Sequence, residues 1–305
     1  MEKDRLIWFK GSIIPANQAS INILAPTSQF GANVFEGIRC YWNPKQKQLY
    51  AFRLNEHIKR LQNSSKLMRF EEKYSYKALL TAFIDTIQAN EFHEDIAVRQ
   101  TIFLDGDGSW FSKAPVNMFI SPIPKKRLDP DSDSGIKCCI CSWERINDNS
   151  LSPRIKVGAN YINSRMAQLE AIQNGYNSAI FLNNHGKIAE GPGSCIFILR
   201  NNTLITPPIT ASILESITRD TIINITENEL NIKVIERDID RTELYVADEA
   251  FLCGSAMEIT PIINIDGFSI SNASKGNMTK ELHKLYLSIA SGENNKYNHW
   301  LTSIY

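Results

Sequence analysis

The sequence predicts an α+β fold, with short strands paired through tight turns and helices that occur as separate segments. The turn at residues 183–186, Asn-Asn-His-Gly, lies between two apolar runs and is typical of a β-hairpin. Helical runs do not alternate regularly with strands, which argues against a doubly wound sheet. The chain shows no internal repeat, and its 305 residues suffice for one large domain or two of ordinary size.

In the first part of the chain, five apolar runs bounded by turn residues are predicted to be strands. They cover residues 6–14, 20–24, 49–53, 96–104 and 116–120. Ser75 is a favourable N-cap for the apolar helical stripe behind it, and Asn55 is expected to open an earlier helix. Arg99 is unusual inside its strand, because an arginine among apolar residues requires a partner or a ligand.

The Pro- and Ser-rich segment 122–135 is predicted to be an interdomain loop. It would separate a small N-terminal α+β domain, residues 1–121, from a large C-terminal cofactor-binding domain, residues 136–305. Strands are predicted in the second domain at residues 136–143, 178–182, 187–189, 195–200 and 203–206. Helices are predicted from about Asn163 to Gly175, from near Ser216, and from about Thr279 to Ala290.

The charge balance argues against some classes of partner. Lys+Arg and Asp+Glu both total 33, so the formal net charge is zero. A protein without an overall basic field is not expected to bind nucleic acid or an anionic membrane. The charged N-terminal segment does not resemble a signal peptide, and no run of about 18 apolar residues follows it. A cytoplasmic protein is therefore expected.

The six cysteines lie in apolar, strand-like surroundings. Cys138, Cys139 and Cys141 are close in sequence, but they lack the paired C-x-x-C spacing and the neighbouring histidines of a metal site. Free cysteine is a common residue of protein cores. The sequence therefore predicts buried thiols and no metal site.

The segment Arg154–Ser164 contains the strongest candidate for a reactive residue. Lys156 precedes Gly158, which permits close backbone approach, and Asn160 and Tyr161 add polar groups nearby. A lysine whose amine is kept neutral by burial or a neighbouring cation can form a Schiff base. The alternative is that Lys156 is an ordinary solvated charge. The residues around it do not decide between the two readings.

Six segments carry a resemblance to a known family. They are Val34–Arg39, Phe52–Leu61, Lys156–Tyr161, Ala189–Gly191, Ile217–Asp220 and Leu244–Pro261. In this order and at these separations, over nearly the whole chain, they resemble the branched-chain-amino-acid aminotransferases of the fold-type IV pyridoxal phosphate (PLP) enzymes. The resemblance implies two α+β domains with PLP as the cofactor in the cleft between them.

The resemblance also implies which residues bind PLP. Lys156 would hold the cofactor covalently and carry the substrate proton. Glu190 matches the acid that keeps the pyridine nitrogen protonated, although outside the family it would be read as an ordinary turn residue. Arg60 matches the phosphate arginine, whose fork of donors suits a phosphate. The remaining members of the implied set are Tyr161 near O3′, Ile217 and Thr218 at a helix N-terminus, and Ser255 at the phosphate.

A substrate pocket is implied in the same way. Its residues are Phe30, Phe35, Gly37, Arg99, Gly193 and, through its backbone N–H, Ala256. Phe30 and Ala97 stand where many members have tyrosine, and the loop at 121–127 lacks the aromatic residue that often closes the pocket. Ser216 replaces a glycine and would be strained only if that glycine's backbone angles were unusual. Together these departures predict a roomier or more polar pocket.

The activity implied is transfer of the amino group of an L-amino acid, Leu, Ile or Val, to 2-oxoglutarate by a ping-pong mechanism in branched-chain amino acid biosynthesis. One alternative is a PLP-dependent aminotransferase of a specialised pathway that acts on a polar or unusual amino acid. Others are a D-amino acid aminotransferase or an aminodeoxychorismate lyase, which share the fold, and an inactive binding or structural protein. The Phe35–Arg39 signature favours the L-branched-chain group, and the retained Lys156 and Glu190 argue against loss of activity.

The expected partners are small-molecule amino acid and 2-oxo acid substrates, without nucleic acid or membrane. Family resemblance further implies a homodimer at least, in which loops of the partner subunit complete the pocket. Residues near Asp105 to Ser109 are the candidates for this contribution.

Overall fold

The computed structural model describes residues 5–132 and 134–305, which divide into two compact units. The first unit contains the chain up to Arg127 together with residues 155–159 and 288–305, and the second contains Leu128–Arg154 and Asn160–Leu287. Each unit has one sheet with helices packed on it, so the predicted α+β class is confirmed. The domain division at 122–135 stays a prediction, while residues 155–159 and 288–305 pack with the first unit.

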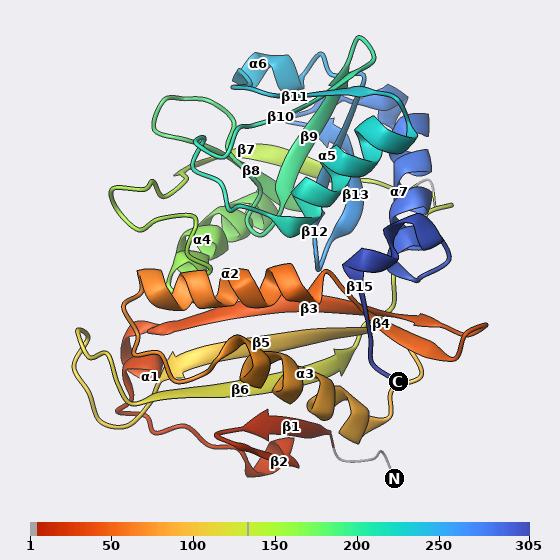
Figure 1. Ribbon diagram of the computed structural model, residues 1–305. Coiled ribbons are helices and arrows are strands. Elements are labelled where there is room, and N and C mark those ends of the chain that lie inside the picture. Colours follow the sequence, from red (N-terminus) through yellow and green to blue (C-terminus); the bar gives the residue numbers. More distant parts are fainter. Residues whose placement is uncertain (1–4, 133) are drawn as a thin grey trace. The chain divides into compact units, whose positions relative to one another are not determined.

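The first unit is built on a seven-stranded antiparallel sheet in the order β15-β4-β3-β5-β6-β1-β2. Its strands are β1 (Leu6–Phe9), β2 (Ser12–Pro15), β3 (Asn33–Asn43), β4 (Gln48–Phe52), β5 (Ile96–Leu104), β6 (Val116–Pro124) and β15 (Leu301–Ser303). Its helices are η1 (Ala16–Gln18), α1 (Pro26–Phe30), α2 (Leu54–Leu67), α3 (Tyr76–Asn90) and η3 (Asn295–Trp300). The helices α2 and α3 pack on each other and together cover one face of the sheet (Figure 1).

The second unit contains an eight-stranded mixed sheet, with β14 attached to β13 outside the path β11-β10-β9-β12-β13-β7-β8. Its strands are β7 (Ile136–Glu144), β8 (Ser178–Leu182), β9 (Cys195–Arg200), β10 (Thr203–Thr206), β11 (Lys233–Glu236), β12 (Glu249–Gly254), β13 (Glu258–Ile265) and β14 (Phe268–Ser269). Its helices are α4 (Asn160–Gln173), α5 (Ile217–Glu229), α6 (Arg241–Leu244), η2 (Ser271–Ala273) and α7 (Asn277–Ala290). Helix α4 packs on β7 and β8, and α5 packs on β11 and β12 (Figure 1).

Strong local signals place several elements where the sequence predicts them. The strands β5, β9 and β10 have the predicted bounds. Ser75 is the N-cap of α3, and its side chain accepts a hydrogen bond from the Ala78 N–H at 3.3 Å. Helix α2 begins at Leu54, one residue before the predicted start. Helix α4 begins at Asn160, three residues before the prediction (163 − 160), and Gly175 follows its end with φ of 82°.

Four predictions of local structure are wrong. Residues 6–14 form two strands, β1 and β2, because the chain turns at Lys10 and Gly11. Residues 20–24 are not a strand, because Asn22 Oδ1 accepts from the Leu24 N–H at 2.9 Å and turns the chain towards α1. Residues 122–124, assigned to the loop, extend β6, whose Pro122 and Pro124 pair with Val98 and Ile96. Residues 187–189 form only isolated bridges, since Lys187 pairs with Asp240 outside the sheet.

Removing the cap of α3 is expected to cost stability. Ser75→Ala deletes the acceptor for one N–H of the first turn and should lower the free energy of unfolding by about 1 kcal/mol. Urea denaturation followed by circular dichroism measures this difference. The matched variant Ser20→Ala changes an exposed serine outside any helix and should leave the transition midpoint unchanged. Equal midpoints for the two variants would contradict the capping role.

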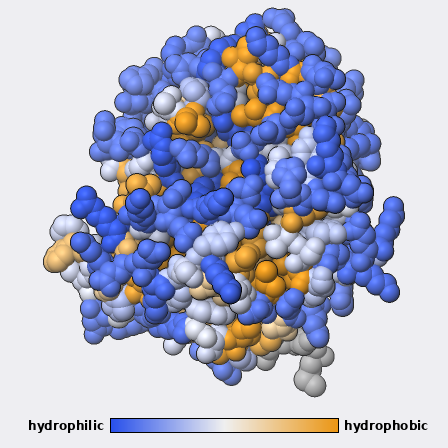
Figure 2. Space-filling view, in the orientation of Figure 1, coloured by the Kyte–Doolittle hydropathy of each residue, from blue (hydrophilic) through white to orange (hydrophobic). Residues whose placement is uncertain are grey.

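Figure 2 shows a face dominated by hydrophilic residues and interrupted by separate hydrophobic patches. All six cysteines are free and buried. Burial raises the pKa of Cys139 to about 11 and that of Cys141 to about 12, so both thiols are protonated at neutral pH. Among the described helices, none combines the length and the apolar character needed to cross a membrane.

Candidate active site

Lys156 belongs to the first unit, although the sequence on both sides of residues 155–159 belongs to the second. Its carbonyl oxygen accepts from the Phe35 N–H of β3 at 2.9 Å. Its own N–H donates to Ser64 Oγ of α2 at 3.1 Å. The main chain of Lys156 is therefore fixed from both the sheet and the helix, and its position does not depend on its side chain.

The residues that follow Lys156 lie close to the start of β3. Val157 forms an isolated bridge with Val34, and the Gly158 N–H donates to the carbonyl of Asn33 at 3.0 Å. A Cβ at Gly158 would lie 2.6 Å from Asn33 Oδ1, which confirms the predicted close approach. A larger residue at position 158 would have to displace this amide or the segment itself.

The side chains next to Lys156 on β3 and β5 combine cations with an aromatic ring. Lys156 Nζ lies 5.2 Å from the centroid of the Phe35 ring, and the Arg99 guanidinium carbon lies 4.0 Å from the same centroid. Arg99, the arginine inside β5, thus has Phe35 as an aromatic partner. Gly37 pairs with Arg99, and a Cβ added to it would meet no atom of the described residues within 4 Å. The glycine therefore leaves open space on the strand face that carries Phe35.

Arg60 is held by a buried carboxylate. Its Nε and Nη2 donate to the two oxygens of Glu36 at 2.7 Å each, and His57 Nδ1 lies 2.7 Å from Glu36 Oε2. The Glu36 side chain is 0 % exposed and that of Arg60 is 13 % exposed. A bidentate pair of this kind fixes the plane of the guanidinium. Arg60 is thus a cation whose orientation is fixed by Glu36.

The protonation of this group follows from its charges. Burial alone would raise the pKa of Glu36, but the charge and hydrogen bonds of Arg60, together with His57, lower it from 4.5 to about 2. Burial lowers the pKa of His57, and Arg60 and Lys156 act in the same direction while Glu36 opposes them. At neutral pH Glu36 is ionised and His57 is neutral, so His57 Nδ1 donates its proton to the carboxylate.

In the second unit, the backbone oxygen of Glu190 accepts a hydrogen bond from the Phe181 N–H of β8 at 2.9 Å. Its Oε1 accepts from Arg145 Nε at 2.9 Å, and its Oε2 accepts from the Leu214 N–H at 3.3 Å. The two charged side chains are 5 % and 7 % exposed. Arg145 also donates to Asn163 Oδ1 of α4 at 3.1 Å. The Glu190 carboxylate is therefore fixed by an ion pair that is itself anchored to a helix.

Ile217 and Thr218 are the first two residues of α5. Ser216 is the N-cap, and its Oγ accepts from the Arg219 N–H at 3.2 Å. Its φ of −81° and ψ of 127° suit any residue, so serine in place of glycine bears no strain here and caps the helix. First-turn N–H groups have no acceptor within their helix and favour an anion at the N-terminus.

Two further loops of the second unit lie against each other. A Cβ at Gly193 would be 4.0 Å from Tyr161 Cε1, and one at Gly254 would be 3.3 Å from the Gly193 oxygen. Ser255 and Ala256 follow Gly254 in the turn between β12 and β13. Within the second unit, Tyr161, Gly193 and the turn with Ser255 and Ala256 are therefore neighbours.

Phe30 is the remaining predicted site residue. It is the last residue of α1 and is 48 % exposed. Phe30 takes part in none of the contacts described above, and its role in the substrate pocket stays a prediction.

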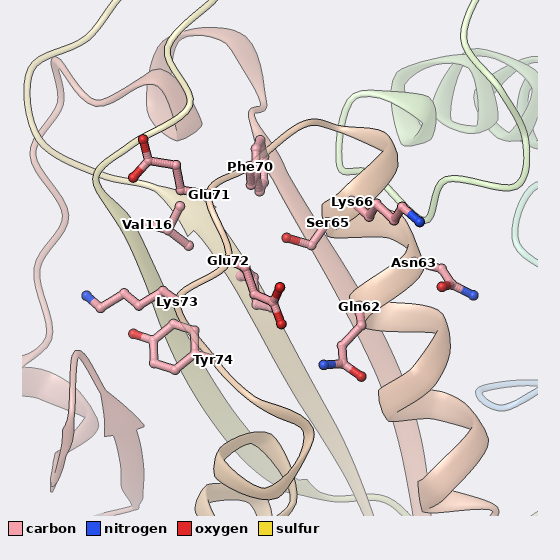
Figure 3. Close-up of a pocket in the computed structure, with 11 residues that line it drawn as sticks. Gln62, Asn63, Ser65, Lys66, Phe70, Glu71, Glu72, Lys73, Tyr74 and Val116 are labelled. Atoms are coloured by element: carbon pink, nitrogen blue, oxygen red, sulfur yellow. The ribbon is translucent and has the colours of Figure 1, made fainter.

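A surface pocket of about 490 Å³ in the first unit is distinct from these residues. It is lined by Gln62, Asn63, Ser65, Lys66, Phe70, Glu71, Glu72, Lys73, Tyr74, Ile102 and Val116. Figure 3 shows Gln62 and Ser65 of α2 facing the loop that carries Phe70 to Tyr74. None of the predicted site residues lines this pocket.

Comparison with known proteins identifies the family. The amino-transferase class IV family model matches residues 33–265. The chain is 37 % identical over 303 residues to the probable branched-chain-amino-acid aminotransferase of Aquifex aeolicus, covering 98 % of this chain and 96 % of the relative. The chain belongs to the class IV aminotransferases.

Solved structures confirm the fold of this class IV aminotransferase. The branched-chain amino acid aminotransferase of Thermobaculum terrenum in its PLP form is 40 % identical, with a TM-score of 0.94 over 100 % of both chains. That of Thermoproteus uzoniensis, solved with norvaline, is 38 % identical, with a TM-score of 0.92 over 98 % of this chain and 99 % of the other. A third such enzyme, complexed with N-(5'-phosphopyridoxyl)-L-glutamate, is 30 % identical, with a TM-score of 0.93 over 99 % of both chains. The predicted fold-type IV architecture is therefore confirmed.

The aminotransferase side chains fit PLP by their chemistry. The first unit offers an amine on a fixed main chain, Lys156, and a guanidinium oriented by a carboxylate, Arg60. The second unit offers an anchored carboxylate, Glu190, and the N-terminus of α5. These are the groups that a carbonyl, a phosphate and a pyridine nitrogen require.

Three residues of these clusters, Glu36, His57 and Arg145, were not predicted from the sequence. Glu36 is a charged residue inside a strand, where packing does not require one, and His57 precedes Arg60 by three positions, which places both on one face of α2. These signals could have indicated a shared partner. No comparable signal points to Arg145, because its carboxylate partner is 45 residues away in the chain.

Glu36→Gln tests the buried ion pair through the pH dependence of stability. A carboxyl whose pKa is lowered from 4.5 to about 2 stabilises the fold above pH 4.5, and this contribution is lost as the pH falls towards 2. The loss is on the order of 3 kcal/mol of the free energy of unfolding. Urea denaturation at pH 7 and pH 3 should show a smaller acid-induced loss for the variant than for the wild type.

A suitable control for this experiment is Glu56→Gln. Glu56 lies on α2, the helix that carries Arg60, but its side chain is 33 % exposed and pairs with Arg53 at the start of that helix. This variant should retain the wild-type pH dependence. Identical acid sensitivity of wild type and Glu36→Gln would contradict the assignment.

Proposed function

We propose that this protein is a PLP-dependent aminotransferase that transfers the amino group of Leu, Ile or Val to 2-oxoglutarate in two half-reactions. The observation that carries the proposal is the fixed main chain of Lys156 in a chain that matches branched-chain aminotransferases along its whole length. Substrate and acceptor would use one pocket in turn.

The residues of this chain have separate tasks in that reaction. Bound PLP supplies an electron sink when the Cα proton of an amino acid leaves. Lys156 Nζ would hold the coenzyme covalently until the substrate amine displaces it, and the freed lysine amine would then take up the Cα proton and give it back. Arg60 would suit the phosphate by its oriented guanidinium, and the N-terminus of α5, with Thr218, would suit it by its free N–H groups. Glu190 would accept a hydrogen bond from the pyridine N–H and so keep that nitrogen protonated, and Tyr161 would be the partner of O3′.

Substrate recognition falls to the neighbouring groups. The open space at Gly37 beside Phe35 suits an aliphatic side chain, and the Arg99 guanidinium suits a carboxylate. Ala256 would offer its N–H to the substrate carboxylate, and Gly193 lies beside Gly254 at the start of the same turn. The glutamate adduct bound by the third solved enzyme supports glutamate and 2-oxoglutarate as the second substrate pair.

A visible absorption spectrum tests the proposal. The purified protein should show the band of bound coenzyme, which L-leucine bleaches and 2-oxoglutarate restores. Initial rates at several fixed concentrations of 2-oxoglutarate should give parallel double-reciprocal lines. A coenzyme band that ignores leucine, or intersecting lines, would contradict the proposal.

A second candidate is an aminotransferase of a specialised pathway. The absence of tyrosine at Phe30 and Ala97 and of an aromatic residue in the loop at 121–127 favours a polar or unusual substrate. A panel of L- and D-amino acids in the same spectral assay separates the candidates. Bleaching by a polar amino acid alone would select the second.

We also propose that two copies of the chain form a dimer. The segments at 21–24 and 107–111 are joined by the hydrogen bond from Asn22 Nδ2 to Asp107 Oδ1. They expose Ile23 (80 %), Trp110 (72 %) and Phe111 (68 %), and apolar side chains of this size are usually covered at an interface. Sedimentation equilibrium should give twice the mass of the chain. The cytoplasmic location stays a prediction.

A further inference from the structure

Three buried ionisable residues of the second unit have no part in the reaction described above. Glu258, Lys275 and His283, here called the anchor cluster, are 0 %, 8 % and 1 % exposed. Lys275 Nζ lies 3.4 Å from His283 Nδ1, and His283 Nε2 lies 3.8 Å from Glu258 Oε2. Because an ammonium can only donate, Nδ1 accepts from Lys275. Among the described residues Nε2 has no hydrogen-bond partner, so the imidazole lies between the cation and the anion without bridging them.

The anchor cluster binds the main chain of residues 128–130. The Leu128 N–H donates to Glu258 Oε2 at 2.7 Å, and Lys275 Nζ donates to the Pro130 carbonyl at 2.9 Å. Buried ionisable groups are costly unless their hydrogen bonds are satisfied. In the anchor cluster, two of the hydrogen bonds are made to the main chain of residues 128–130. The cluster thus fixes the start of the second unit, directly after the loop at 121–127.

Glu258 also ends the turn that contains Ser255 and Ala256. It is the first residue of β13 and pairs with Gly254 across that turn. Its φ of 48° lies in the left-handed region, which is unfavourable for a residue other than glycine. Such a conformation persists only where the surroundings hold it, and the bonds of the Glu258 carboxylate supply that restraint.

We propose that Glu258 is a positioning residue that ties residues 128–130 to the turn 254–258 and thereby keeps Ser255 and Ala256 in place. The inference rests on the roles proposed above for these two residues in binding the coenzyme phosphate and the substrate carboxylate. Loosening the link weakens binding in the ground state and in the transition state alike. KM therefore rises while kcat is retained.

Kinetics and hydrogen exchange of the holoenzyme test the link together. Glu258→Ala, at saturating PLP, is expected to raise KM for leucine and 2-oxoglutarate by about tenfold, with kcat within about twofold of wild type. Amide exchange of the peptide covering residues 128–132 should become faster by about tenfold. Lys275→Met removes the bond to Pro130 and leaves the turn intact. It should give the same faster exchange with a smaller rise in KM, by about threefold.

Asp131→Asn is the matched control. Its carboxylate lies 2.6 Å from Lys284 Nζ, but the two side chains are 61 % and 50 % exposed. An exposed pair of this kind contributes little, so neither KM nor the exchange of residues 128–132 should change. This variant separates the anchor cluster from any effect of altered charge in the segment.

A folded Glu258→Ala enzyme that changes only KM, only the exchange, or neither overturns the proposal. If that variant does not fold, since Lys275 and His283 lose their carboxylate, unchanged exchange in Lys275→Met overturns it instead. Failure of the proposed function is a different result. The wild type would then not react with leucine, while exchange of residues 128–132 would still report on the link.

Discussion

Replacing Lys156 by alanine is expected to abolish transamination, lowering kcat by about 10³-fold or more. The amine is the group that holds the coenzyme and carries the substrate proton. The fold should survive, since the backbone N–H and C=O of residue 156 make the contacts that hold the segment.

Two measurements check this prediction. Leucine turnover gives the loss of rate, and mass spectrometry of borohydride-reduced protein should find the coenzyme on the Lys156 peptide of the wild type only. Lys137→Ala is the control, because Lys137 is an exposed residue of β7. This variant should turn over leucine like the wild type. A Lys156→Ala enzyme with a tenth of wild-type activity would contradict the proposed role.

Local chemistry explains the part of the fold that could be predicted. Ser75 and Ser216 each precede an apolar run, and each caps a helix with its hydroxyl group. The bounds of β5 follow from the turn residues on either side of a strand-like run, although the polar residues 99–101 interrupt its apolar character. Where local signals conflict, as at residues 20–24, the short-range bonds of Asn22 prevail over the apolar pattern.

Long-range contacts account for most of what could not be predicted. Residues 155–159 pack with the first unit, which no property of their own sequence indicates. The partners of Arg60 and Glu190 are 24 and 45 residues away. Resemblance to a family could name these two residues, because their types recur at fixed separations. It could not show that Glu36 and Arg145 orient them, since orientation depends on packing.

Glu190→Gln is expected to lower kcat by about 10²-fold or more, because a neutral amide cannot stabilise a protonated pyridine nitrogen. The amide keeps the size of the side chain, so substrate binding should change little. Arg145 would lose its carboxylate partner inside the second unit, and an unpaired buried charge lowers the free energy of unfolding by about 3 kcal/mol or more. Leucine kinetics and urea denaturation measure the two effects separately.

The variant Arg145→Met separates the effect of the Glu190 charge on the rate from the effect of the position of its carboxylate. This variant leaves the carboxylate in place but removes the bond at 2.9 Å that fixes it, so kcat should fall by about tenfold, less than in Glu190→Gln. The absorption maximum of the bound coenzyme should shift in Glu190→Gln and remain in Arg145→Met, because only the former loses the negative charge. Glu144→Gln, an exposed neighbour of Arg145 in the sequence, should leave rate, stability and spectrum unchanged. Equal rates and spectra for Glu190→Gln and the wild type would show that the pyridine nitrogen has another partner.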